Sequence, residues 1–321
     1  MPTTGTHFGK INWRNPRRAS SAAALACVLL AATQPVWASG DPGDAGALFL
    51  RIGMGARASA MGEGYIGVAE DASSVYWNPA AMAAVLGTHL QFTHDEYLLS
   101  SRVEQLALTH ETRYGTLGLS FTGMYMDDME RREDVPTAIP LGTFSVYDAS
   151  FAFGFARYIF PNTSVGATAK PVYQKIDAWS ASGWAFDVGI FHVARIDGLK
   201  LAAVVGNLGA PMKFIEEEYA LPRHIKVGGS YERETATLRG RFMFTLDGMW
   251  INDGDPKQNL GAEYMYRRTI AVRAGYKAGY DSYGGTFGLG IRYKQLDVDY
   301  AFILLKNDLG DSHRFSVGLH L

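Results

Sequence analysis

Histidine is the side chain of this sequence with the widest chemical use, since it binds metals and transfers protons near neutral pH. The 321-residue chain has 8 histidines, and none lies in a nucleophile-elbow or metal-ligand pattern. His89 and His94 are five residues apart on a predicted strand, so they point to opposite faces. We predict no cofactor, no metal and no catalytic site. An enzyme with serine and histidine on a barrel wall stays an alternative, because a triad is recognised by geometry.

Charged residues recur within segments that otherwise alternate between bulky apolar and small side chains. Asp187, for example, lies between Phe186 and Val188. An Arg or Lys facing lipid at the membrane midplane costs about 2–4 kcal/mol, so these charges should face an enclosed interior. There they either form ion pairs that brace the wall and hold an internal segment, or are solvated separately by lumenal water. The residues are Asp148, Asp187, Asp247, Glu263, Arg273, Lys277, Arg292, Asp297, Asp299 and Arg314.

Strands must position these charges, because period-two alternation runs through most of the chain after residue 88. In residues 116–125 one face reads Leu117, Leu119, Phe121, Gly123, Tyr125, and the other holds mainly Thr, Gly and Ser. A bulky, aromatic-rich face opposite a small, polar face suits a barrel with lipid outside and a crowded interior. Lipid permits no open sheet edge, so the strands must close on themselves. A soluble periplasmic sandwich or propeller is the rival all-β interpretation.

We predict about fourteen antiparallel transmembrane strands in residues 88–321, with residues 39–87 forming a plug segment that contains a short helix. The even number is typical of bacterial barrels. The predicted strands cover residues 88–97, 102–111, 115–126, 144–156, 163–176, 183–193, 199–206, 222–232, 238–251, 258–268, 270–279, 285–294, 296–304 and 313–321. Two long connections, 127–142 and 207–222, could meet a partner or lie over the barrel mouth.

Residues 1–38 have the order of a secretory signal peptide: basic residues, an apolar stretch, then the small-residue site Val36-Trp37-Ala38. An N-terminal membrane anchor and lipidation at Cys27 are the alternatives. Cleavage after Ala38 removes four basic residues and no acidic ones, which changes the formal charge from −2 to −6. The mature chain then has no cysteine, and its acidity gives no support for nucleic-acid binding. The predicted location is the outer membrane of a bacterial envelope.

Residues 55–83 read GARASAMGEGYIGVAEDASSVYWNPAAMA. Glycines here allow tight turns and close backbone approach. Asn78 is a plausible N-cap and Pro79 suits a first helical turn, which predicts a short apolar helix over residues 80–86.

This segment resembles the PorV/PorQ family of outer-membrane proteins, relatives of the FadL long-chain fatty acid transporters. The matching elements are Gly55-Ala56-Arg57-Ala58, Met61-Gly62, Ala69-Glu70-Asp71 and Tyr76-Trp77-Asn78-Pro79-Ala80, with Gly206-Asn207-Leu208-Gly209 and Arg273-Ala274-Gly275-Tyr276 further along. The resemblance implies a fourteen-stranded barrel with an N-terminal segment folded into the lumen. It marks Arg57, Trp77, Asn78 and Pro79 as the plug motif.

The resemblance leaves two functions open, since function lies in sites rather than folds. A PorV-like protein would serve protein export and surface attachment of the type IX secretion kind, with secreted cargo proteins or secretion-machinery subunits as partners. A FadL-like protein would take up hydrophobic small molecules. We place the export role first, uptake second and a structural envelope role third.

Overall fold

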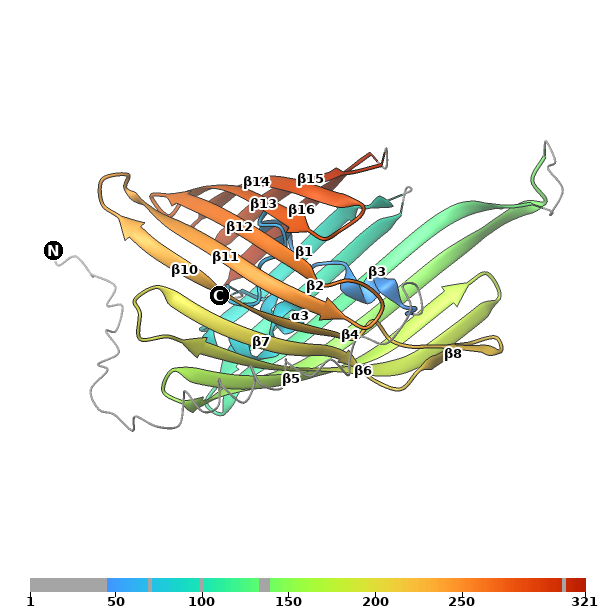
Figure 1. Cartoon of the computed structure of the whole chain (residues 1–321), viewed down its shortest axis with the longest axis horizontal. Coiled ribbons are helices and arrows are strands. Elements are labelled where there is room, and N and C mark those ends of the chain that lie inside the picture. Colours follow the sequence, from blue (N-terminus) through green and yellow to red (C-terminus); the bar gives the residue numbers. More distant parts are fainter. Residues whose placement is uncertain (1–44, 69–70, 99–100, 133–138, 308–309) are drawn as a thin grey trace. The chain divides into compact units, whose positions relative to one another are not determined.

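The computed structural model describes residues 45–68, 71–98, 101–132, 139–307 and 310–321; the predicted signal peptide, residues 1–38, lies outside them. Fourteen strands form a closed antiparallel barrel (Figure 1). Strand β1 (Thr88–Glu96) closes it by pairing with both β2 (Arg102–Thr112) and β16 (Asp311–His320). The barrel predicted from the alternating side chains is therefore confirmed.

The other barrel strands pair with their neighbours in chain order, except that β7 pairs with β10 because a small hairpin lies between them. Their bounds are β3 (Gly115–Arg131), β4 (Gly142–Phe160), β5 (Thr163–Ile176), β6 (Trp179–Val193), β7 (Leu199–Leu208), β10 (His224–Thr235), β11 (Gly240–Ile251), β12 (Lys257–Tyr266), β13 (Ile270–Ala278), β14 (Tyr283–Tyr293) and β15 (Leu296–Leu305).

The wall separates bulky side chains outside from small and polar ones inside. On β4, Phe151, Phe153 and Phe155 are exposed on the outer face, whereas Ala152 and Ala156 are buried on the inner face. The same alternation continues around the barrel, which gives it an apolar outer surface suited to hydrocarbon. Within the described residues, no helix is both long and apolar enough to cross a membrane.

The two ends of the barrel differ in their connections. At one end, the short-turn end, two-residue turns join β2 to β3, β4 to β5 and β14 to β15. At the other, the long-loop end, all connections except the two-residue β5–β6 turn are longer, and the β3–β4 hairpin projects beyond its neighbours (Figure 1). Bacterial barrels turn their short connections to the periplasm, so we expect the short-turn end to face it.

Residues 45–87, which we call the plug, run through the lumen from one end to the other. At the long-loop end Gly46 N donates to Ala220 O at 3.0 Å, and at the short-turn end Thr88 N donates to Leu321 O at 3.2 Å. Four short helices lie along this path: η2 (Leu48–Arg51), α2 (Ala56–Ala60), α3 (Ser74–Trp77) and η3 (Pro79–Ala84). The plug therefore occupies the lumen that the strands enclose.

Two local predictions need correction. The helix predicted over residues 80–86 is the 3₁₀ helix η3, which ends at Ala84 because Val85 is extended and Gly87, at φ 76°, turns the chain into β1. The predicted connection 207–222 contains a hairpin, β8 (Met212–Phe214) and β9 (Glu217–Tyr219). Three residues per strand are too few for an alternating pattern to reveal.

Candidate functional site

Helix η3 of the plug lies against inward-facing glycines of β3 to β6. A Cβ atom added at Gly166 would come within 2.5 Å of the Pro79 carbonyl carbon and oxygen, and one at Gly189 would collide with Asn78 Oδ1. Gly118 and Gly154 face Met82 in the same way. We call Gly118, Gly154, Gly166 and Gly189 the glycine cradle. Since only glycine leaves room for such close approach, the cradle fixes the position of Pro79 and its helix.

Asn78 connects three parts of the molecule through one fully buried side chain. Its Oδ1 accepts a hydrogen bond from Ala80 N at 3.0 Å and so caps η3. Its Nδ2 donates to Ile66 O in the plug and to Ile190 O in strand β6, each at 3.2 Å. The capping role agrees with the sequence-based prediction, and the link to the wall is added by the fold.

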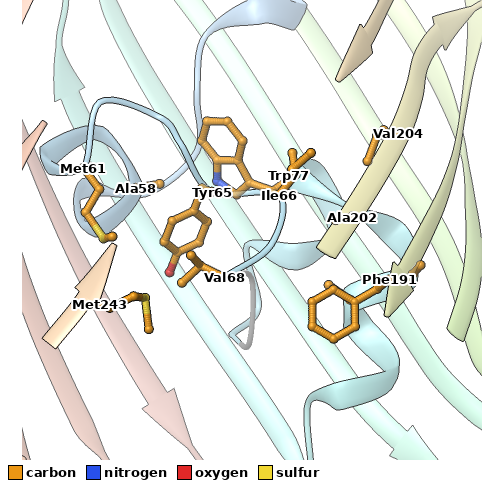
Figure 2. Packing of buried hydrophobic residues seen from close by; sticks show 12 residues of the cluster. Ala58, Met61, Tyr65, Ile66, Val68, Trp77, Phe191, Ala202, Val204 and Met243 are labelled. Atoms are coloured by element: carbon orange, nitrogen blue, oxygen red, sulfur yellow. The ribbon is translucent and has the colours of Figure 1, made fainter. Parts of the chain in front are cut away.

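Trp77 binds the two halves of the plug together. Its Nε1 donates to Met54 O at 2.9 Å, and its ring meets Tyr65 and Tyr76 edge-on at centroid distances of 5.8 and 5.0 Å. Figure 2 shows Trp77 and Tyr65 among apolar side chains from the plug and from strands β6, β7 and β11. The Lys226 Nζ lies 4.8 Å from the Trp77 ring, which gives this cation a partner inside the lumen.

Arg57, on helix α2, starts a chain of charges that crosses from the plug into the wall. Its Nε and Nη2 atoms donate to the two oxygens of Glu263 at 2.8 and 2.9 Å. Glu263 also accepts from Arg273 Nε at 2.7 Å, and Arg273 Nη1 donates to Asp299 at 2.6 Å. We call Arg57, Glu263, Arg273 and Asp299 the ionic chain. Burial opposes the charge on Arg57, but Glu263 outweighs it and raises the pKa of Arg57 above its ordinary value.

A second set of charges holds the loop around α2. Arg314 on β16 forms an ion pair with Asp95 on β1 and also donates to Gly53 O and Ser59 Oγ of the plug. This pair crosses the seam where the barrel closes. Lys277 on β13 binds Glu63 of the plug at 2.7 Å. Burial favours the neutral form of Glu63, but Lys277 and Arg314 outweigh it and lower the pKa of Glu63.

Asp247 anchors the plug without a cation. Its Oδ2 accepts the backbone N–H groups of Tyr65 at 2.7 Å and Ile66 at 3.1 Å. Plug backbone that would otherwise be buried without partners is thereby satisfied.

The remaining predicted charges stay within the wall. Asp187 binds Lys170 at 2.8 Å and accepts from Asn207 N at 2.8 Å. At the short-turn end, Asp297 is bound by Arg292 at 2.8 Å and by His320 at 2.9 Å. Asp148 departs from the ion-pair hypothesis, since among the described residues it has only the Gln174 amide as a partner, at 3.1 Å.

Sequence reasoning missed several partners of these charges. Lys170 and Asp95 lie on inward faces of their strands, so the alternation could have found them. Glu63 lies in the plug, where no periodic pattern assigns a direction to a side chain. Among the described residues, no group of three or more His, Cys, Asp or Glu side chains could hold a metal ion.

An apolar groove of about 300 Å³ lies on the wall across β4, β5 and β6, on the opposite side of the sheet from Met212. The β4–β5 register passes from Ser150–Val172 to Phe153–Ala169 with no pair at Pro171, which lacks an N–H group. A Cβ atom at Gly183 would lie 2.6 Å from Met212 Cγ, so little more than Gly183 separates groove and lumen here. The groove is lined by Ala149, Phe151, Pro171, Val172, Tyr173, Ser182, Gly183 and Trp184.

The barrel resembles solved outer-membrane channels. The crystal structure of the Pseudomonas putida toluene transporter TodX gives a TM-score of 0.56 at 11% identity, covering 83% of this chain and 96% of that chain. A TodX monoaromatic hydrocarbon channel with the ΔS2S3 mutation gives a TM-score of 0.57 at 11% identity, covering 83% and 97%. At this identity the likeness shows a shared fold. With the apolar outer surface of the barrel, it confirms the predicted outer-membrane location.

Among curated proteins, none matches this sequence significantly. The sequence model of the family described as "Uncharacterised protein family (UPF0164)" matches residues 24–204, which is more than half of the 321 residues. This chain therefore belongs to the uncharacterised family UPF0164.

Proposed function

We propose that this protein is a plugged outer-membrane channel for the uptake of hydrophobic small molecules, with no catalytic role. The observation that carries the proposal is the apolar groove at Pro171. Its aromatic side chains, Phe151, Tyr173 and Trp184, line a concave apolar surface of the kind that binds small apolar ligands. The fold shared with TodX, described as a toluene transporter, supports the same assignment.

The lumen side of the wall suits the same class of molecule. At the long-loop end, Phe49, Leu50 and Ile52 of the plug pack against Val172 of β5 and Met212 of the hairpin in one buried apolar cluster. Met212 belongs to this cluster and also lies against Gly183 of the wall. A flexible, polarizable Met side chain at this point can move aside at low cost. The apolar cluster in the lumen and the apolar groove therefore lie on the two sides of the same stretch of wall, with Met212 packed against Gly183 between them.

The export role that the sequence analysis placed first is less well supported. It rests on the likeness of the plug motif to PorV/PorQ proteins, and neither the match to UPF0164 nor the TodX fold adds to it. Hydrophobic uptake has both a structural neighbour and a groove of suitable chemistry. The export role is therefore kept as the competing outcome of the experiment below.

The test compares toluene uptake at low concentration in a deletion strain that carries either the wild-type gene or a variant. Gly183→Leu pushes into Met212, on the lumen side of the wall behind the groove, so uptake should fall at least fivefold. Gly284→Leu is the matched control, since a Cβ atom there lies 3.5 Å or more from its neighbours. Equal uptake with and without the gene, together with loss of proteins from the cell surface, would favour export and overturn the proposal.

A further inference from the structure

The short-turn end carries an arc of exposed cations on three turns that neighbour each other around the rim. Arg239 lies in the β10–β11 turn, Arg267 and Arg268 in the β12–β13 turn, and Lys294 in the β14–β15 turn. We call these four residues the basic arc. The arc lies outside the lumen and contacts neither the plug motif nor the groove.

The backbone at these positions does not favour long side chains. All four residues have positive φ: 52° at Arg239, 49° at Arg267, 58° at Arg268 and 55° at Lys294. Tight hairpin turns in this conformation prefer Asn and Gly, because other residues are strained there. The local fold therefore does not explain why cations occupy all four positions, which indicates that their positive charge has another role.

Backbone hydrogen bonds hold the turns in register. Arg267 N donates to Arg239 O at 2.9 Å, and Arg292 N donates to Thr269 O at 2.7 Å. The first bond joins the β10–β11 turn to the β12–β13 turn, and the second joins the β12–β13 turn to the end of β14. The cations are therefore carried on a continuous, fixed rim.

The arc lies where the apolar belt of the barrel ends. The Arg267 guanidinium is 5.2 Å from the ring of Tyr266, and the Lys294 ammonium is 5.3 Å from the ring of Tyr293. Both rings are exposed, and the exposed Ile270 and Ile291 lie beside them on the outer face, where Ile270 pairs with both Tyr266 and Ile291. Tyrosines mark the membrane interface, and cations beside them lie at the depth of lipid phosphates.

Few acidic groups neutralise the arc. Glu234 binds Arg268 at 2.8 Å, but both side chains are more than 70% exposed, so this pair is weak. Among the described residues no ion pair is formed by Arg239, Arg267 or Lys294. The long-loop end is mixed in charge: its exposed cations lie among exposed acidic residues, which include Glu216, Glu217, Glu218, Asp255 and Asp281.

We propose that the basic arc binds the headgroups of anionic phospholipids in the leaflet that meets the short-turn end. The interfacial tyrosines, the apolar side chains beside them and the unneutralised cations match a lipid with a negatively charged phosphate. Each cation near an anionic surface contributes roughly fivefold in affinity. The arc thereby fixes the height of the rim in the bilayer, whatever the channel carries.

The experiment counts lipids that stay bound to the purified full barrel by native mass spectrometry, after exchange into equal phosphatidylglycerol and phosphatidylcholine. The arc variant combines four substitutions that suit positive φ, so folding should be maintained: Arg239→Asn, Arg267→Asn, Arg268→Gly and Lys294→Asn. The control removes four exposed cations at the long-loop end: Arg102→Asn, Lys175→Asn, Lys213→Asn and Lys306→Asn. Heat-modifiable electrophoretic mobility checks that each variant is folded.

We expect the wild type to prefer phosphatidylglycerol, the arc variant to lose this preference at least tenfold and the control to stay within twofold. Three results would overturn the proposal. The wild type could show no preference, or both variants could lose it equally, which would indicate net charge alone. Soluble glycerol 3-phosphate could displace the lipid, which would indicate a phosphate site rather than a lipid surface.

Discussion

The two ends of the plug motif are held by different physical means. Helix η3 is seated by shape: glycine backbone on β5 and β6 lies against Pro79 and Asn78, and glycine backbone on β3 and β4 lies against Met82. Helix α2 is seated by charge: Arg57 reaches Glu263, and the chain continues to Arg273 and Asp299. The plug is therefore held by close packing on one side of the lumen and by ion pairs on the other.

The two kinds of contact explain how one part of the plug can stay fixed while another part can be released. Close packing fails only when atoms collide or are removed, so the glycine cradle keeps η3 in place under all solution conditions that preserve the fold. A buried ion pair depends on both partners staying charged, and losing one leaves the other without compensation. We therefore expect α2 to be the part that responds to its surroundings, and η3 to be the fixed point.

The largest effect should come from Glu263→Gln, which removes the carboxylate that Arg57 and Arg273 share and leaves Arg273 only its pair with Asp299. Removing one partner of a buried charge pair costs about 3–5 kcal/mol. Urea unfolding of the purified barrel measures this loss. In the control Glu232→Gln, the pair with Arg241 has side chains 27% and 24% exposed, so the cost should be below about 1 kcal/mol. If both variants lost the same free energy of unfolding, the pairing of Glu263 with Arg57 would be no more stabilising than a partly exposed ion pair.

A smaller but still substantial effect is expected for Gly166→Ala in the cradle. The new methyl group meets the Pro79 backbone, which has no room to move, and overpacking of this kind costs about 1–3 kcal/mol. Single-channel conductance should rise in the same variant, because a displaced η3 opens the lumen. Gly318→Ala serves as the comparison, since its nearest neighbour would be 3.5 Å away. If both variants behave alike, shape does not seat η3.

Asn78 both caps η3 and contacts the glycine cradle, so variants at this position can separate the two roles. Asn78→Ala removes the N-cap and both bonds from Nδ2, and we expect a loss of about 1–2 kcal/mol. Asn78→Ser keeps a capping oxygen and removes the donor to Ile66 and Ile190, so its loss should lie between wild type and Asn78→Ala. Thermal unfolding of the three proteins gives the order. A Ser variant as damaged as the Ala variant would assign the whole effect to the bonds that Nδ2 donates.

The smallest effect concerns pH and the ionic side alone. The pKa of Glu63 is lowered from 4.5 in the folded protein, so its pair with Lys277 stabilises the plug fully above that value. The contribution is lost as pH falls below 4.5 through the folded pKa. Conductance between pH 7 and pH 3 should therefore rise more for the wild type than for Glu63→Gln. Identical curves would show that Glu63 does not hold the loop.

The strands were predictable because each face meets a different solvent. The alternation also fixes the direction of Asp187 and Arg273, both of which are buried inside the wall. Strand β3 was predicted to stop at residue 126 but runs to Arg131, because a register shift between Met126 and Met129 breaks the alternation. A bulge of this kind leaves no periodic signal.

The partners of the charges were not predictable in the same way. Asp95 and Arg314 are 219 residues apart, and only the closing register of β1 with β16 brings them together. The plug adds a further difficulty, because Glu63 and Arg57 lie in short helices and turns whose directions depend on the lumen around them. The plug motif can be identified from its composition. The ionic chain cannot, because it depends on the path that the plug takes through the lumen.

The path of the plug also determines how it would yield to force. Its first described residue, Ala45, is at the long-loop end, and its last turn continues directly into β1. Tension applied at Ala45 would unravel η2 first, then strip Arg57 from Glu263, and reach Asn78 and the glycines last. A force applied from outside would therefore detach the plug stepwise. Helix η3 would be its last attachment before the force reaches the strands.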